Sequence, residues 1–267
     1  MQAYAYAAWQ AAARILAALG EPVRAEAYAR RAARLRRDFD AAFWDEALGT
    51  YVLALDGEKR PCRVRASNAG HALFAGIALP ERAARVAHTL LDPSFFTGWG
   101  IRTIASGEAR YNPMSYHNGS VWPHDNALVA EGFARYGLRE AAARVFGALF
   151  DAAAAAEQRR LPELFCGFPR RHGQGPVLYP VACSPQAWAA STPFALLRAC
   201  LGLGFDPAQA GVAFDQPVLP RFLHGLTLHN LRLGGGHLDI AFRRVDGEVA
   251  MHVLGRSGGV RATLRIG

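Results

Sequence analysis

Residues 122–150, WPHDNALVAEGFARYGLREAAARVFGALF, carry the clearest pattern in the chain. Pro123 suits the first turn of a helix, and Gly137 suits the position that ends one. After Gly137, apolar residues recur at the spacing of one helical face, from Leu138 to Phe150. The stretch therefore predicts two helices separated by a very short turn, as in an antiparallel helical hairpin.

The same rhythm of helix, short gap, helix and long gap runs over residues 1–204. We expect Ser67 to cap a helix and residues 51–55 to form a short strand. Two long gaps, 93–119 and 157–185, hold most of the unusual residues, and we expect them to converge on one rim. Apolar periodicity predicts seven to eight helices, including 4–19, 25–44, 68–77, 80–91, 122–136, 138–150 and 186–203.

After Gly204 the apolar pattern changes to period two. Residues 238–242, 249–253 and 260–266 alternate in this way, with glycine-containing turns between them, as strands of an antiparallel sheet do. We therefore divide the chain into a helical domain, 1–204, and a C-terminal β-rich subdomain, 211–267. The fold class predicted from these patterns is mainly α, with a small antiparallel β-sheet packed on the helices.

Composition excludes several protein classes. Hydrophobic residues make up 51% of the chain and charged residues 19%, which is typical of a globular protein with a substantial core. Arg, Gln or Gly interrupts every long apolar stretch, so we expect neither a membrane span nor a signal peptide. The net charge of +8 comes mainly from arginine, and the densest run, Arg30 to Arg37, favours a solvated helix face over nucleic-acid binding.

Cysteine and histidine spacing argues against a metal site. The four cysteines show no zinc-type spacing, which favours free thiols in a reducing cytoplasm. His117 and His124 are seven residues apart, a spacing that matches no standard metal site. We therefore expect a cytoplasmic protein with no metal and no cofactor. The four cysteines are Cys62, Cys166, Cys183 and Cys200.

The segment Thr97-Gly98-Trp99-Gly100-Ile101-Arg102-Thr103 places an indole between two glycines. Glycines let the backbone approach a neighbour closely, and an indole offers a flat apolar face with one N–H donor. Such a ring suits the C–H face of a sugar, with Arg102 available to bind hydroxyls. A packed corner loop explains the segment equally well.

Residues 111–126, YNPMSYHNGSVWPHDN, combine aromatic rings with amides and imidazoles and end at a helix N-terminus. A surface turn does not need tyrosine and tryptophan, and a core does not tolerate so many amides. A pocket for a polyhydroxyl ligand explains both features better than a buried polar network does. The candidate contact residues here are Tyr116, His117, Asn118, Trp122, His124 and Asp125.

Two further segments bring a carboxylate and a second indole. Glu163 lies between apolar neighbours in the second long gap, where it is either an exposed loop residue or a buried acid–base group. In CSPQAW, residues 183–188, we expect Ser184 to cap a helix with Pro185 in its first turn. Gln186 and Trp188 repeat the pairing of an amide with an indole that suits sugars.

Taken together, these motifs resemble the bacterial amylo-α-1,6-glucosidase family, the glycogen-debranching-type proteins of the six-hairpin glycosidase superfamily. The resemblance is carried by 111–126, 161–164 (LPEL) and 183–188, in this order along the chain, and 67–71 (SNAGH) and 98–102 (GWGIR) also look like family signatures. It implies an (α/α)6 toroid of helical hairpins and hydrolysis of α-glucosidic bonds, α-1,6 branches of glycogen-like glucans, by inversion. It also implies that Glu163 is the general base of a carboxylate pair, which in inverting enzymes is roughly 6.5–9.5 Å apart.

The chain departs from this family in two respects. The aspartate of the family's Arg-Asp-Thr segment, the proposed general acid, has no match, because Arg37-Asp38-Phe39 lies on the arginine-rich helix. The predicted helices are also too few for a complete ring. We therefore expect a partial toroid, inactive alone, whose acid lies in a missing N-terminal part of the same enzyme. Asp125 is the internal alternative for the acid, or it orients His124 or a sugar hydroxyl.

Other functions remain open at this stage. A carbohydrate-binding or scaffold module would keep the aromatic and amide residues and hydrolyse nothing. Another six-hairpin activity, trehalase-like or mannosylglycerate-hydrolase-like, would use the same carboxylates on another sugar. In each case the expected partner is an oligosaccharide or glucan, with no nucleic acid and no membrane.

Overall fold

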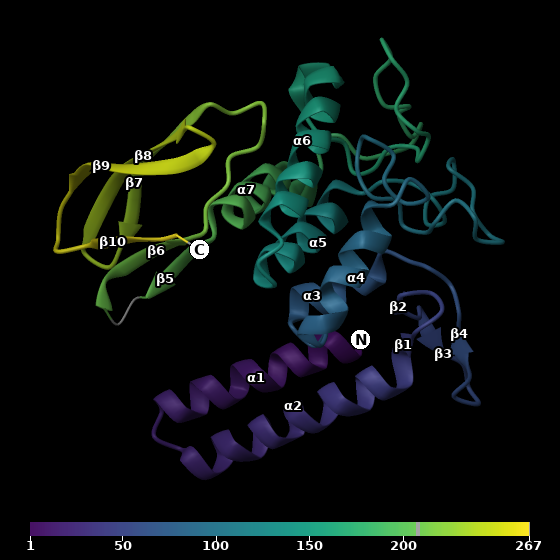
Figure 1. The fold of residues 1–267 in the computed structure, drawn as a ribbon, viewed down its shortest axis with the longest axis horizontal. Helices are drawn as coiled ribbons and strands as arrows, with labels where there is room; N and C mark the ends of the chain where they lie inside the picture. Colours follow the sequence, from purple (N-terminus) through teal and green to yellow (C-terminus); the bar gives the residue numbers. More distant parts are fainter. Residues whose placement is uncertain (207–208, 267) are drawn as a thin grey trace.

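The structure, a computed structural model, describes residues 1–206 and 209–266. Helices dominate its first three quarters, and strands form its C-terminal part (Figure 1). One short 3-10 helix, Glu157–Arg159, follows α6. The described part holds seven α-helices: α1 Gln2–Ala18, α2 Pro22–Phe43, α3 Asn68–Ala75, α4 Pro80–Leu91, α5 Pro123–Arg135, α6 Arg139–Ala155 and α7 Ala187–Leu201.

The helices pair as the sequence rhythm predicts. α1 and α2 lie side by side, as do α5 and α6, and each pair is joined by a turn of a few residues (Figure 1). Gly20 and Gly137, one in each turn, have positive φ angles of 77° and 76°, which glycine adopts without strain. α5 is central, because it also packs on α3 and α7. The mainly α fold built from helical hairpins is confirmed.

α3 and α5 cross at very short range. A Cβ atom at Gly132 would lie 2.7 Å from the Phe74 backbone nitrogen and 2.9 Å from Leu73 Cβ. A Cβ atom at Gly70 would likewise lie 2.5 Å from a methyl group of Val129. The side chains of Leu73 and Val129 are fully buried at this crossing. The main core therefore forms where these two helices meet.

The segment between α2 and α3 carries four two-residue strands rather than one strand over 51–55. Val52 and Leu53 lie between the second strand and the third. These two strands belong to different sheets, because each of them pairs with a different strand. Ser67 occupies the N-cap position of α3, as predicted, but its side chain makes no capping hydrogen bond. The strands are β1 Trp44–Asp45, β2 Thr50–Tyr51, β3 Ala54–Leu55 and β4 Pro61–Cys62, paired β1 with β2 and β3 with β4.

The C-terminal region forms two three-stranded sheets where the sequence predicts one antiparallel sheet. In the first sheet, ordered β10-β6-β5, β10 runs parallel to β6; the second, ordered β7-β8-β9, is antiparallel throughout. The strands begin at Leu203, before the predicted boundary at 211, because β5 pairs with β6. Their bounds are β5 Leu203–Asp206, β6 Gly211–Asp215, β7 Gly225–Leu233, β8 Gly236–Val245, β9 Glu248–Arg256 and β10 Arg261–Arg265.

The two sheets share a second core with α7. Phe214 and Phe242 are fully buried there with ring centroids 4.8 Å apart, and Leu201 of α7 contacts the same cluster. The sheets therefore pack on the helical region, on the side away from the long loops (Figure 1).

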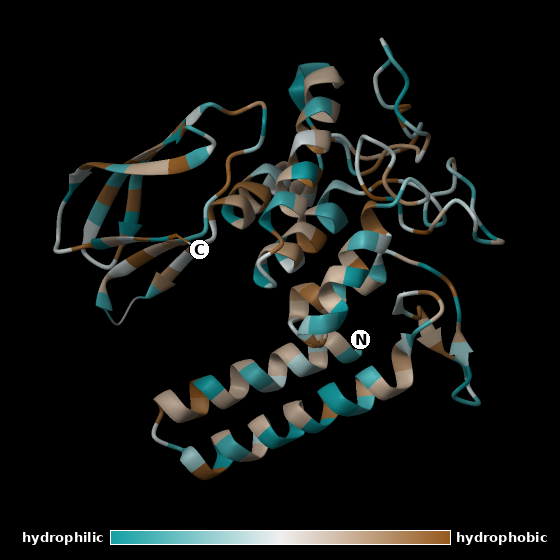
Figure 2. Cartoon of the chain, in the orientation of Figure 1, coloured by the Kyte–Doolittle hydropathy of each residue, from teal (hydrophilic) through white to brown (hydrophobic). Residues whose placement is uncertain are grey.

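Apolar and polar residues alternate along α1 and α2 (Figure 2). Ala32 and Phe39 of α2 are buried, while Arg30, Arg34 and Arg37 are exposed, so the arginine run forms a solvated face. Within residues 1–206 and 209–266, no helix is both long enough and apolar enough to cross a membrane.

Two glycines in neighbouring helices make a matched test of this packing. We expect Gly132→Ala in α5 to lower the free energy of unfolding by about 1–3 kcal/mol, because its methyl group would overlap α3. Gly147→Ala in α6 meets no atom within 4 Å and should raise that free energy by roughly 0.5–1 kcal/mol through helix propensity. Urea unfolding of both variants measures the difference. Equal effects would show that α3 and α5 are not in close contact.

Candidate functional site

The long loops are joined by a ladder of isolated antiparallel bridges. Arg102 pairs with Val121, Val121 with Phe165, and Phe165 with Leu178. These bridges bring the predicted gaps 93–119 and 157–185 together beyond the ends of α4 and α6 (Figure 1). The prediction that both loops converge on one rim is confirmed.

A glycine pair allows the loops to approach this closely. A Cβ atom at Gly167 would overlap the carbonyl oxygen of Gly119, so the two backbones touch directly. Gly119 has a φ of 140°, and a Cβ atom there would lie 2.6 Å from the Asn112 carbonyl oxygen. The Gly167 carbonyl also accepts hydrogen bonds from Arg102 Nε at 2.7 Å and Tyr111 Oη at 3.3 Å. Gly167 therefore holds three loop segments together.

Glu163 is a buried carboxylate with two hydrogen-bond donors. Tyr116 Oη donates to Oε1 at 2.8 Å, and the Cys183 backbone N–H donates to Oε2 at 3.2 Å. Burial acts to raise the pKa of Glu163, but these hydrogen bonds, helped by Gln186, hold that pKa below its ordinary value. The hydrogen bond to Glu163 in turn raises the pKa of Tyr116. Glu163 is therefore ionised at neutral pH and faces a protonated phenol.

Aromatic rings continue from Tyr116 across the helix starts. Its ring lies edge-on to Trp122, with centroids 4.8 Å apart. Trp188, at the start of α7, stacks on His124 at 4.3 Å and lies 6.3 Å from Trp122. Trp122 is 7% exposed and Trp188 is 44% exposed. Trp188 is therefore the more exposed of the two indoles in this aromatic cluster, which Tyr116 connects to Glu163.

The remaining polar residues of this region are partly engaged by backbone groups. Trp122 Nε1 donates to Ser120 Oγ at 2.9 Å and to the Tyr116 carbonyl at 3.1 Å. His117 is exposed and lies parallel to Trp122, with centroids 6.0 Å apart. The backbone carbonyl of Asn118 accepts a hydrogen bond from the backbone N–H of Asn112, which closes the loop.

Gln186, not Ser184, caps α7. The helix begins at Ala187, and the Gln186 side chain accepts a hydrogen bond from the Ala187 N–H at 3.1 Å. Pro185 consequently lies before the helix rather than in its first turn. This shift brings Gln186 close enough to contribute to the pKa of Glu163.

Asp125 belongs to a separate hydrogen-bonded chain on α1, α3 and α5. Its Oδ1 lies 2.5 Å from His71 Nε2, and His71 Nδ1 lies 2.6 Å from Tyr4 Oη. Burial acts to raise the pKa of Asp125, but His71 outweighs it and the pKa falls below its ordinary value. Asp125 is therefore an ionised partner of His71, and a general acid must instead be protonated.

Trp99 and Arg102 are placed away from an open ligand face. Trp99 is 4% exposed and is covered by the Arg170 guanidinium, 4.4 Å from the ring centroid. Arg102, 3% exposed, donates to the carbonyls of Gly167, Pro93 and Ser94. Both side chains support the loops, which agrees with the alternative of a packed corner loop.

Comparison with known proteins now identifies the family. Residues 1–168, which include Glu163, match the model of the "Mannosylglycerate hydrolase MGH1-like glycoside hydrolase domain". The chain belongs to this glycoside hydrolase family. It is therefore a member of the six-hairpin glycosidase superfamily, as the sequence motifs indicate, whereas amylo-α-1,6-glucosidase identity receives no support.

Three known proteins are similar to this glycoside hydrolase chain. Mannosylglycerate hydrolase MGH1 of Selaginella moellendorffii is 37% identical over 116 residues, which are 42% of this chain and 23% of that protein. The crystal structure of a GH63 mannosylglycerate hydrolase from Thermus thermophilus with glucose has a TM-score of 0.55 at 24% identity, over 73% of this chain and 46% of that one. Neutral trehalase Nth1 of Saccharomyces cerevisiae shares the fold, with a TM-score of 0.58 at 15% identity. The match covers 74% of this chain and 37% of the trehalase.

The glycoside hydrolase chain thus spans about a quarter of the length of the curated relatives that it matches. It also spans less than half of the Thermus enzyme. Similarity to these proteins supports a fold built from helical hairpins. The activities named for the full-length relatives describe those proteins.

Sequence reasoning did not name four residues individually that the structure places near the site, although His71 and Asn126 lie within the motifs 67–71 and 111–126. His71 contacts Asp125, and Tyr4 contacts His71. The ring centroids of Tyr179 and Tyr116 lie 5.6 Å apart. Asn126 is fully buried and ties Ile101 to α5 through hydrogen bonds of 2.7 and 3.0 Å. For His71 the available signals were its place in the motif 67–71 and its position in the mostly apolar helix α3.

Metal-binding groups do not gather among residues 1–206 and 209–266. Over the described residues, no group of three or more His, Cys, Asp and Glu side chains is placed to hold a metal ion. The four cysteines are free thiols, of which Cys166 and Cys200 are buried. Burial raises the pKa of both thiols.

The Tyr116–Glu163 hydrogen bond gives a pH-dependent prediction for the hydrolase. A lowered folded-state pKa of Glu163 stabilises the fold above its unfolded pKa of about 4.3, and this stabilisation disappears as the pH falls through the folded value. Tyr116→Phe removes the main donor, so the pKa of Glu163 should rise and stability should be lost at a higher pH. Unfolding measured between about pH 3 and pH 8 tests this.

Tyr111→Phe is the matched control. Tyr111 Oη donates to the Gly167 carbonyl, which does not titrate. Its loss should lower stability equally across this pH range. Superimposable pH profiles for the wild type and Tyr116→Phe would contradict the role given to Tyr116.

Proposed function

We propose that this chain carries the general base of an inverting glycoside hydrolase, and that Glu163 is that base. The observation that carries the proposal is the ionised, buried Glu163 carboxylate, which Tyr116 holds and connects to the aromatic cluster that includes the exposed Trp188. A base accepts a proton only when it is ionised and oriented. An indole next to such a carboxylate offers a face on which a sugar ring stacks.

In this reaction a water molecule attacks the anomeric carbon while Glu163 accepts its proton. Tyr116 Oη and the Cys183 N–H hold one oxygen each, which fixes the plane of the carboxylate. A general acid on the opposite face of the sugar protonates the leaving oxygen, and the configuration inverts.

For the substrate we propose a glycoside of a small hydroxy acid of the mannosylglycerate type. Support comes from the family match over residues 1–168 and from the two Selaginella mannosylglycerate hydrolases. The α-1,6-glucan alternative rests on sequence motifs alone, and likeness to the yeast trehalase is a likeness of fold.

We place the general acid outside these 267 residues, in polypeptide equivalent to the part of the relatives that the chain does not span. Asp125 is the internal alternative, but its lowered pKa and its bond to His71 suit an ionised positioning group. A cytoplasmic location remains part of this proposal.

The test compares substrates and carboxylates in the longest natural chain that contains these residues. Mannosylglycerate, glucosylglycerate, trehalose and an α-1,6-linked glucose oligosaccharide are each assayed for released sugar. Glu163→Gln should lower turnover by about 10²–10⁴ while ligand affinity by calorimetry changes little. Glu58→Gln, in an exposed turn, is the control and should leave turnover unchanged.

The outcomes separate the alternatives. If Glu163→Gln retains more than about a tenth of wild-type turnover, well short of the loss of a general base, Glu163 is not the base. Preferential hydrolysis of the α-1,6 oligosaccharide would overturn the proposed substrate. Activity of the 267 residues alone would return the acid role to Asp125. Binding without any turnover would indicate a carbohydrate-binding module.

Trp188 gives a separate prediction for the ligand face. We expect Trp188→Ala to weaken sugar binding by about three- to tenfold, since it removes a stacking face worth around 0.5–1.5 kcal/mol. Calorimetry with the best substrate of the panel, on the Glu163→Gln background, measures this without turnover. Unchanged affinity would place the sugar elsewhere. Trp99→Phe, in the covered corner, is the control because Trp99 is buried under Arg170.

A further inference from the structure

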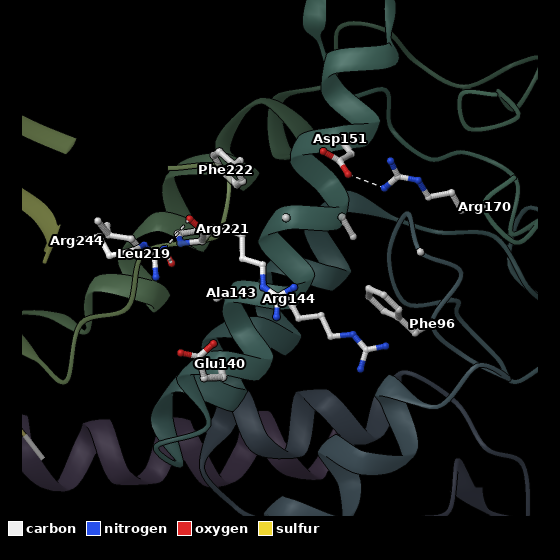
Figure 3. A pocket seen from close by; sticks show the side chains of 14 residues that line it. Phe96, Glu140, Ala143, Arg144, Asp151, Arg170, Leu219, Arg221, Phe222 and Arg244 are labelled. Atoms are coloured by element: carbon white, nitrogen blue, oxygen red, sulfur yellow. Dashed lines mark hydrogen bonds and ion pairs between the residues drawn. The ribbon is translucent and has the colours of Figure 1, made fainter. Parts of the chain in front are cut away.

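A second cavity, of about 600 Å³, lies where the helical layer, the loops and the C-terminal sheets meet. α6 forms its floor, Phe96 and Arg170 come from the two long loops, and Leu219 to Phe222 and Arg244 come from the sheet side (Figure 3). Ligand sites commonly have this volume and lie between structural units. None of the aromatic residues around Glu163 lines it.

The cavity carries an excess of positive charge. Its lining includes four arginines, Arg144, Arg170, Arg221 and Arg244, against two carboxylates, Glu140 and Asp151. Arg170 is paired with Asp151 at 2.5 Å. For Arg144 and Arg221, no ion pair with a carboxylate is found among the described residues. The site therefore has a net charge of about two positive units before any ligand binds.

Contacts within the protein orient most of these guanidinium groups. Arg144 lies over the Phe96 ring, 4.5 Å from its centroid. Arg170 is held between Asp151 and the Trp99 ring. Arg244 donates to the carbonyls of Leu219 and Pro220. Pre-oriented arginines are suited to binding planar or tetrahedral oxyanions.

The rest of the lining leaves room for a body attached to the anion. Ala143, Gly147 and Ala148 present small side chains, and a Cβ atom at Gly147 would meet nothing within 4 Å. Phe222 adds an apolar wall and is stacked on Phe150, with centroids 3.7 Å apart. The cavity thus joins a cationic region to a flat apolar wall.

We propose that this cavity binds a small organic dianion, a sugar phosphate or a dicarboxylate, through Arg144 and Arg221. The oxyanion pairs with these two guanidinium groups over the floor of α6, and the organic part lies against Phe222. This site is distinct from the proposed sugar site at Glu163 and does not depend on hydrolysis.

Binding is tested by calorimetry on the 267-residue protein at constant ionic strength. The probes are inorganic phosphate, glucose 6-phosphate, succinate and neutral glucose. We expect at least one dianion to bind and glucose not to bind here. If glucose 6-phosphate binds more tightly than phosphate, the site is a sugar phosphate site. If succinate binds more tightly than both, it is a dicarboxylate site. Absence of binding by all three anions would overturn the proposal.

Charge-matched variants locate the site. Arg144→Gln with Arg221→Gln should weaken dianion binding at least tenfold, which corresponds to about 1.4 kcal/mol. Arg14→Gln with Arg37→Gln removes the same charge from exposed positions of α1 and α2 and should change affinity less than twofold. Equal losses in both pairs would show that only overall charge attracts the anion, which overturns the proposal.

A space-filling variant gives a second test. Gly147→Trp should block the cavity, whereas Gly147→Ala leaves it open. Retained binding in a folded Gly147→Trp protein would contradict the proposed position. If Gly147→Trp does not fold, the two arginine pairs decide the question, because all four of these arginines are exposed and their replacement leaves the core intact.

Discussion

The direct contact between the backbones at Gly119 and Gly167 is the constraint on which the site depends. It leaves no space for a side chain, and the bridges from Val121 to Phe165 continue the same contact. Tyr116 lies three residues before Gly119, and Glu163 lies four residues before Gly167. Their 2.8 Å hydrogen bond is therefore a consequence of how closely the two loops meet. Helix packing brings the loops to one rim, and the glycines set the final distance.

Local patterns were sufficient to predict the helices and their pairing. Apolar spacing and turn glycines such as Gly20 and Gly137 act over a few residues, so they are visible in sequence. The parallel pairing of β10 with β6 joins segments about fifty residues apart, which no local pattern encodes. Likewise, Ser184 and Gln186 both suit a helix start, and tertiary contacts around Glu163 decided between them.

Prediction of the site residues was limited by which side chains other segments bury, and not by which residue types are present. Trp99 and Trp188 look equivalent in sequence, since each is an indole among small or polar neighbours. Arg170 covers the first, while the second remains open beside His124. Arg102 was an equally plausible ligand residue, but three backbone carbonyls occupy its guanidinium. Whether a side chain is free for a ligand depends on distant segments, and one sequence does not reveal these.

The division of labour between elements has a consequence for evolution. The loops that hold the Glu163 carboxylate are joined by β-bridges, whereas the exposed indole of Trp188 lies on the first turn of α7. Mutations in that turn change the residues around the Trp188 ring without disturbing the hydrogen bonds that hold Glu163. Descendants of one ancestral gene are therefore free to diverge around the indole while inheriting the same anchored carboxylate, and gene duplication followed by drift in a few codons suffices for such divergence.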